Sequence, residues 1–210
     1  MTPTAVRGAL GFLTRIPVGR SEAAWGAFTR SPATFPLVGS LVGGLLSLPL
    51  LLAPVAPAPT VALAFVVTAY GVTGITHLDG VADLGDAAVV HGDREERRRV
   101  LKDSALGVGG TVALAVVVLG LATAVLGLVT LAATHNGLRV AVGIVVAAEV
   151  GSKAAMATVV CVGEAAHEGL GSALTDELSP RSALPALVLA APAILLAWPA
   201  ITPGAAALIA

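Results

Sequence analysis

Long uncharged apolar runs alternate with short charged segments along this chain. The apolar runs cover about residues 35–53, 60–78, 106–132, 140–161 and 183–203. A helix needs roughly 20 mainly apolar residues to cross a bilayer, so each run is predicted to be a membrane-spanning helix. Small residues in the first run, Gly39, Gly43 and Gly44, favour close packing against another helix. The pattern predicts an all-α, polytopic transmembrane helix bundle of about five to six spans, forming one integral membrane domain over residues 1–210.

The first 33 residues differ from these runs because they contain four arginines. Apolar residues recur at helical spacing over about 4–16, with Arg7 and Arg15 between them. This segment is too short and too charged to span a membrane. We therefore predict an N-terminal interfacial helix that ends before Pro17, followed by a polar connection over 19–33.

Composition supports an integral membrane protein. Hydrophobic residues make up 56% and charged residues 12% of the chain, and its mean hydropathy is +0.92. Soluble domains carry roughly 25% charged residues. The net charge of −1 argues against nucleic acid as a partner. The single Cys161 excludes an intramolecular disulfide and a metal site built from cysteines.

Basic residues predict the orientation in the membrane. The N-terminal segment carries four arginines and residues 94–102 carry five basic side chains, and two predicted spans separate them. The predicted loops at 54–59 and 133–138 contain no Lys or Arg. An excess of basic residues marks the cytoplasmic side. We therefore expect a multi-pass protein of the cell membrane with the end of the second span facing the cytoplasm.

Three aspartates follow that second span and form the main candidate site. Asp79, Asp83 and Asp86 are the only ionised side chains between Arg30 and Asp93, and their spacing places them on one face of a helix. Three like charges on one face repel each other unless a cation binds. Hard carboxylate ligands favour Mg²⁺ or Mn²⁺, and such ions commonly complete their shell with substrate phosphates. The residues predict metal-assisted phosphoryl transfer; three solvated loop aspartates are the alternative.

Lys102, Asp103 and Ser104 come directly before the third run. One interpretation is a helix start, with Asp103 or Ser104 as the N-cap. The other adds Asp103 as a fourth carboxylate beside the metal, with an anion site at the helix N-terminus. Arg94 and its neighbouring arginines either bind phosphates or lipid headgroups, or only set the topology.

Glu149 and Lys153 lie four residues apart within an apolar run. Such a pair can simply neutralise its own charges, but ionisable groups inside a membrane are functional by default. His77, two residues before Asp79, is either a base or a satisfied interfacial histidine.

Five segments of the chain resemble one enzyme family, adenosylcobinamide-GDP ribazoletransferase, also called cobalamin synthase. The segments are FLTRIPV (12–18), FPLVGSLVGG (35–44), TGITHLDGVADLGDA (73–87), DREERRRVLKDSALGVGG (93–110) and AAHEGLG (165–171). The sequence departs from the family pattern at Ala87, at VVHG (89–92), at Ala105 and at the pair Ser152-Lys153. Family chains are usually somewhat longer. Whether a last helix is missing after Ala210 stays open.

The resemblance implies the last assembly step of cobalamin biosynthesis. In that reaction α-ribazole, or its 5′-phosphate, displaces GMP from adenosylcobinamide-GDP in the presence of Mg²⁺. The resemblance implies catalytic roles for the four aspartates, with Asp79, Asp83 and Asp86 as metal ligands and Asp86 or Asp103 as the general base. It suggests substrate contacts for Arg94, Lys102, Ser104 and Lys153. The base, the acceptor's phosphorylation, the number of metal ions and the oligomeric state, a homo-oligomer included, stay open.

Two alternatives belong beside this interpretation. A CDP-alcohol phosphotransferase has a related core, DG-x-x-AR…G-x-x-x-D-x-x-x-D, but this chain reads DG-x-AD with a shorter spacing to the next aspartate. A small ion transporter would use Asp79, Asp83 and Glu149 as an ion path, although these charges do not extend through the bilayer in the predicted topology. The nucleotide released, GMP or CMP, separates the two enzymes, and ion flux without GMP release identifies the transporter.

Overall fold

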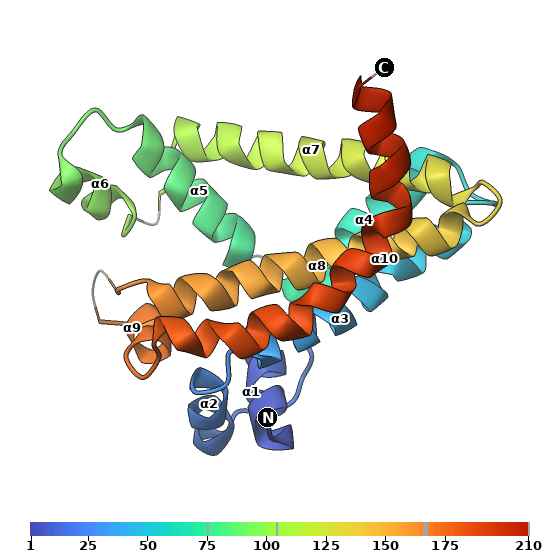
Figure 1. Cartoon of the computed structure of the whole chain (residues 1–210). Coiled ribbons are helices and arrows are strands. Elements are labelled where there is room, and N and C mark those ends of the chain that lie inside the picture. Colours follow the sequence, from blue (N-terminus) through green and yellow to red (C-terminus); the bar gives the residue numbers. More distant parts are fainter. Residues whose placement is uncertain (75, 104, 166–167, 210) are drawn as a thin grey trace.

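The protein folds as a bundle of helices (Figure 1). The computed structural model describes residues 1–74, 76–103, 105–165 and 168–209, and these ranges contain no strand. The helices are α1 (Pro3–Leu13), α2 (Glu22–Thr29), α3 (Thr34–Ser47), the 3₁₀ helix η1 (Leu48–Leu52), α4 (Ala58–Thr73), α5 (Thr76–Val89), α6 (Arg94–Val100), α7 (Val108–Ala132), α8 (Gly137–Val162), α9 (Leu170–Thr175), the 3₁₀ helix η2 (Pro180–Ala183) and α10 (Leu184–Ile209).

Four stretches of helix in the described residues are long and apolar enough to cross a membrane. They are Thr34–Leu52, Val108–Ala132, Gly137–Val162 and Pro180–Trp198, and the bent pair α4–α5 makes a fifth if it counts as one span. At 1.5 Å per residue, a 25-residue helix such as α7 is about 37 Å long, which exceeds the hydrocarbon thickness. The predicted all-helical, multi-pass membrane fold is confirmed.

The second predicted span, 60–78, does not continue as one helix. α4 ends at Thr73, and α5 starts at Thr76 in a direction turned by 97°. Gly74 has a φ of 75°, a left-handed conformation that glycine adopts without steric cost. Arg15 also holds this bend, because its backbone N–H donates to the Val72 carbonyl at 2.7 Å. As a result α5 runs obliquely between α7 and α8 at one end of the bundle (Figure 1).

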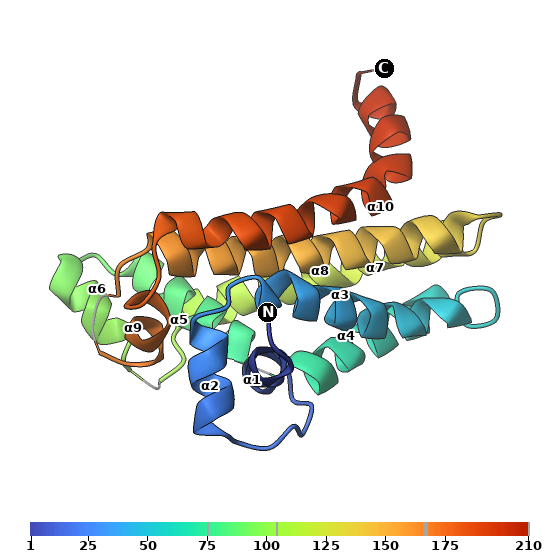
Figure 2. The same cartoon turned by 60° about the horizontal axis from the view of Figure 1, so that its bottom comes forward.

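The closest packing between spans is that of α3 on α8, which lie along each other in Figure 2. A Cβ atom at Gly39 would lie 2.8 Å from the carbonyl oxygen of Glu149, and one at Gly43 would lie 2.7 Å from the Cα of Val146. Neither position has room for a side chain. Small residues let helix backbones approach in lipid, where packing rather than water drives association.

The N-terminal segment contains one more helix than predicted. The interfacial helix is present as α1, but the expected polar connection over 19–33 includes α2, whose first turn is capped by the Ser21 hydroxyl. The two helices cross at Gly8, where a Cβ atom would collide with the carbonyl oxygen of Ala24. Helix α2 escaped the prediction because it is only eight residues long.

Candidate active site

Helix α5 and the α6–α7 connection line an open cavity of about 260 Å³. Its lining is Asp79, Ala82, Asp83, Asp86, Leu101, Lys102, Asp103, Ala105 and Leu106. The three aspartates of α5 therefore share one face toward the cavity, and the connection brings a fourth carboxylate and a lysine to them. Helix α5 and the α6–α7 connection, which line this cavity, lie at the end of the bundle that also carries α9 (Figure 1).

Asp86 joins α5 to the start of α7. Its two carboxylate oxygens accept the backbone N–H groups of Gly107 and Gly110, each at 2.8 Å. The N-cap residue of α7 is Gly107, which has no side chain to accept these donors. A carboxylate is well suited to this place because the first N–H groups of a helix carry partial positive charge and lack partners within the helix.

Glycines allow this close approach of α5 and α7. A Cβ atom at Gly107 would overlap the Asp86 carboxylate, and one at Gly109 would overlap the carbonyl oxygen of Gly85. A Cβ atom at Gly85 would in turn lie 2.6 Å from that of Ala113. The GVGG run over 107–110 is therefore the sequence signal of this contact. The run itself does not identify α5 as the partner helix.

Asp103 does not cap α7, which corrects one interpretation of the sequence. Helix α7 begins at Val108, and Asp103 Oδ1 instead accepts the N–H of Ala105 at 3.0 Å within the connection. Its side chain is exposed beside the aspartates of α5, and so is that of Lys102. Ser104, the other proposed cap and a predicted substrate contact, lies outside the described residues.

Two predicted substrate contacts lie away from the cavity. Arg94 is exposed in the first turn of α6, a helix capped by the Asp93 carboxylate. Lys153 is 4% exposed in α8, and its Nζ donates to Glu149 Oε2 at 3.1 Å. Neither residue lines the cavity.

The donor set of the cavity fits Mg²⁺. Within the described residues, Asp79 and Asp83 accept no hydrogen bond and form no ion pair. Across the described ranges, no three His, Cys, Asp or Glu side chains are already close enough together to hold a metal ion. Mg²⁺ needs no such cage, since it usually binds one or two carboxylates and keeps water and substrate phosphates as its other ligands. Two free carboxylates beside Asp86 meet that requirement.

The sequence profile of the cobalamin-5-phosphate synthase family matches residues 5–210. The chain belongs to this family. A curated relative from Halorubrum lacusprofundi, named adenosylcobinamide-GDP ribazoletransferase, is 72% identical over 212 residues, covering 100% of this chain and 82% of its own length. A relative of the same name from Haloquadratum walsbyi is 48% identical over 202 residues, covering 95% of this chain and 77% of its own. No solved structure matches the chain significantly.

Membership of the cobalamin-5-phosphate synthase family makes the chain a transferase, as the resemblance implied. The family segment THLDGVADLGD contributes the aspartates of α5, and the segment KDSALGVGG contributes Lys102, Asp103 and the glycines at the start of α7. The two most specific motifs of the sequence thus meet around one cavity, which is the candidate active site.

Proposed function

We propose that the protein transfers the cobinamide phosphate of adenosylcobinamide-GDP to α-ribazole, or to its 5′-phosphate, and releases GMP. Family membership supports cobalamin synthase activity, and the names of the relatives suggest these substrates. The observation that carries the proposal for this site is the cavity that gathers Asp79, Asp83, Asp86, Lys102 and Asp103. The two alternatives from the sequence, a CDP-alcohol phosphotransferase and a small ion transporter, have no comparable support.

In this proposal Asp79 and Asp83 would hold Mg²⁺, and Asp86 would lie beside the ion. The ion would neutralise charge on the diphosphate bridge and on the departing GMP. Asp79 and Asp83 are its main ligands, because both oxygens of Asp86 already accept backbone N–H groups. Asp86 contributes any remaining lone pair and keeps the start of α7 against α5. The number of ions is decided by metal analysis of the purified protein.

Asp103 is the proposed general base. A hydroxyl of the acceptor attacks the phosphorus that carries the cobinamide, the bond from that phosphorus to the GMP oxygen breaks, and the hydroxyl proton passes to the Asp103 carboxylate. Asp103 suits this role better than Asp86. Of the two Asp103 carboxylate oxygens, only Oδ1 accepts a hydrogen bond from a described residue, whereas both oxygens of Asp86 accept one. Lys102 donates to the phosphates from the same connection, and Ser104 stays a predicted substrate contact.

The corrinoid donor is larger than the 260 Å³ cavity, so most of it must lie outside. We propose that it extends over the exposed helix α6, where Arg94 is available for a phosphate. The Lys and Arg distribution supports a cytoplasmic location for this end of the bundle. Lys153 is buried in α8, and a role in substrate binding requires that the substrate reach between the helices.

Release of GMP by protein reconstituted in nanodiscs tests this function. With adenosylcobinamide-GDP, α-ribazole and Mg²⁺, we expect GMP release that stops when EDTA is added. Asp83→Ala should lower the rate by about two orders of magnitude or more while membrane insertion stays normal. Asp176→Ala, an exposed aspartate next to α9, is the matched control and should retain activity. Normal GMP release by Asp83→Ala refutes the site, and CMP release from a CDP-alcohol or ion flux without GMP release refutes the function.

A further inference from the structure

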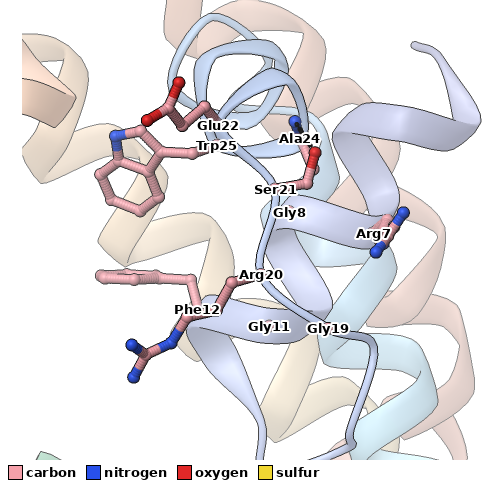
Figure 3. A pocket seen from close by; sticks show the side chains of 10 residues that line it. All are labelled: Arg7, Gly8, Gly11, Phe12, Gly19, Arg20, Ser21, Glu22, Ala24 and Trp25. Atoms are coloured by element: carbon pink, nitrogen blue, oxygen red, sulfur yellow. Dashed lines mark hydrogen bonds between the residues drawn. The ribbon is translucent and has the colours of Figure 1, made fainter.

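A second cavity, of about 330 Å³, lies between α1 and α2 (Figure 3). It shares no lining residue with the aspartate cavity. Its walls combine the rings of Phe12 and Trp25 with the glycines of α1 and with two arginines, Arg7 and Arg20. The proposed reaction uses none of these residues.

The cavity exists because α1 and α2 touch at one point and leave a gap beside it. Gly8 allows the contact with the backbone of Ala24. Gly11, one turn further along α1, has no side chain to fill the adjoining space, and an ideal Cβ atom there would meet only Val18 Cγ2, at 3.2 Å. A Cβ atom at position 11 would therefore meet the end of a side chain rather than the backbone of α2, and a larger residue there would extend into the space that this glycine lines.

The apolar wall is anchored in the protein core. The rings of Phe12 and Trp25 lie 5.6 Å apart, and both rest on Phe28, at 5.4 and 5.7 Å. Phe28 is fully buried, whereas Trp25 is half-buried and presents part of its ring to the cavity. Contacts among aromatic rings of this kind hold their geometry, so the cavity has a preformed apolar surface.

The cationic side of the cavity is Arg20. Arg7 already uses its Nε to donate to the Val18 carbonyl at 2.8 Å, which folds the connection between α1 and α2 around the cavity. Arg20 is exposed and makes no hydrogen bond or ion pair with the described residues. Figure 3 shows its side chain extending on the same side of α1 as the Phe12 ring. Glu22 is the one acid in the lining, so the two arginines leave an excess of positive charge.

The hairpin of α1 and α2 lies beside the spans, nearer the end that carries α6 and α9 (Figures 1 and 2). In the proposed orientation this is the cytoplasmic membrane surface, where anionic lipid headgroups are concentrated. An apolar cavity next to a free guanidinium at that depth matches an amphipathic anion. We propose that the cavity binds one anionic phospholipid. Its acyl chain packs against Phe12 and Trp25, and its headgroup phosphate binds the Arg20 guanidinium.

Fluorescence of Trp25 tests this proposal directly. The chain has two tryptophans, Trp25 and Trp198, so a Trp198→Phe background leaves Trp25 as the sole indole. This protein is reconstituted in phosphatidylcholine bilayers that contain a small fraction of phosphatidylglycerol, and one lipid at a time carries brominated acyl chains. We expect brominated phosphatidylglycerol to quench Trp25 at about fivefold lower mole fraction than brominated phosphatidylcholine, since one basic residue near the surface favours anionic lipid about fivefold.

Two variants and one control identify the site. Arg20→Gln removes the cation, and Gly11→Leu fills the cavity while leaving every charge in place; each should abolish the preference for phosphatidylglycerol. Arg98→Gln removes an exposed arginine of α6 and should preserve it. Equal quenching by the two lipids overturns the proposal, as does a preference that persists in both variants. Loss of quenching with rising protein-to-lipid ratio, independent of headgroup, indicates a second copy of the chain and also overturns it. The measurement needs no turnover, so failure of the proposed function leaves it unaffected.

Discussion

The buried ion pair of α8 offers the sharpest test of how the bundle is stabilised. The Nζ of Lys153 lies 3.1 Å from Glu149 Oε2, and the two side chains are 5% and 23% exposed. The stem of Lys153 packs at Gly39 of α3, where an ideal Cβ atom would lie 3.1 Å from Lys153 Cγ. Lys153→Met retains an unbranched stem against α3 but leaves the Glu149 carboxylate without its cation.

The size of the effect follows from the separation and the burial. At an effective dielectric constant near 20, unit charges 3.1 Å apart attract by about 5 kcal/mol. Most of this attraction offsets the cost of removing both charges from water, and breaking a buried pair on one side typically costs about 3–5 kcal/mol. Because the Glu149 side chain is partly exposed and keeps some contact with solvent, we expect a loss near the lower limit, about 3 kcal/mol. The double variant Glu149→Gln/Lys153→Met should fall within about 1 kcal/mol of the original protein, since no charge stays unpaired.

Reversible unfolding in mixed micelles of dodecyl maltoside and SDS gives the free energy of unfolding of each variant. The reasoning is wrong if Lys153→Met is as stable as the original protein, or if the double variant is no more stable than Lys153→Met. GMP release by the double variant then separates the two sequence interpretations of the pair. Full activity means that the pair is structural, whereas lost activity at restored stability supports the predicted substrate contact of Lys153.

Three further predictions use neighbouring or equivalent residues as controls. Gly43→Val should destabilise the α3–α8 contact by about 1–3 kcal/mol through overpacking, whereas Gly44→Val, next to it in open space, should not; detergent unfolding measures both. Gly109→Leu should separate α5 from α7 and abolish GMP release, while Gly120→Leu, on the open side of α7, should retain it. Asp86→Asn replaces one acceptor oxygen by an NH₂ group that faces a backbone N–H. We therefore expect this variant to have a lower melting temperature than the original protein in metal-free buffer. An unchanged melting temperature contradicts the capping role.

The spans could be predicted because membrane insertion imposes a strong local pattern. A run such as 106–132 contains no charge, and the structure places α7 over Val108–Ala132. The small residues of 35–44 likewise indicated a close contact, now seen at Gly39 and Gly43. In each case the signal lies within one segment, and the lipid solvent leaves few alternatives to a helix.

The bend before the aspartates could not be predicted from its own segment. Residues 60–78 carry no formal charge, and the sequence around Gly74 does not distinguish it from the glycines inside other helices. Its left-handed conformation is supported by a contact from Arg15, which lies about 60 residues earlier in the chain. Long-range contacts of this kind override local helix propensity. The direction of α5 therefore depends on the N-terminal segment.

The same limit explains why the three aspartates appeared equivalent in the sequence. Their spacing places them on one helical face, and nothing in that spacing distinguishes Asp86 from the other two. The distinction comes from α7, whose glycine-rich start approaches α5 and directs two N–H groups at Asp86 alone. Asp79 and Asp83 keep their oxygens available for a cation, while Asp86 is partly committed to structure. Removal of Asp79 or Asp83 should therefore act first on the proposed binding of Mg²⁺, whereas removal of Asp86 should act first on the α5–α7 contact that forms the cavity.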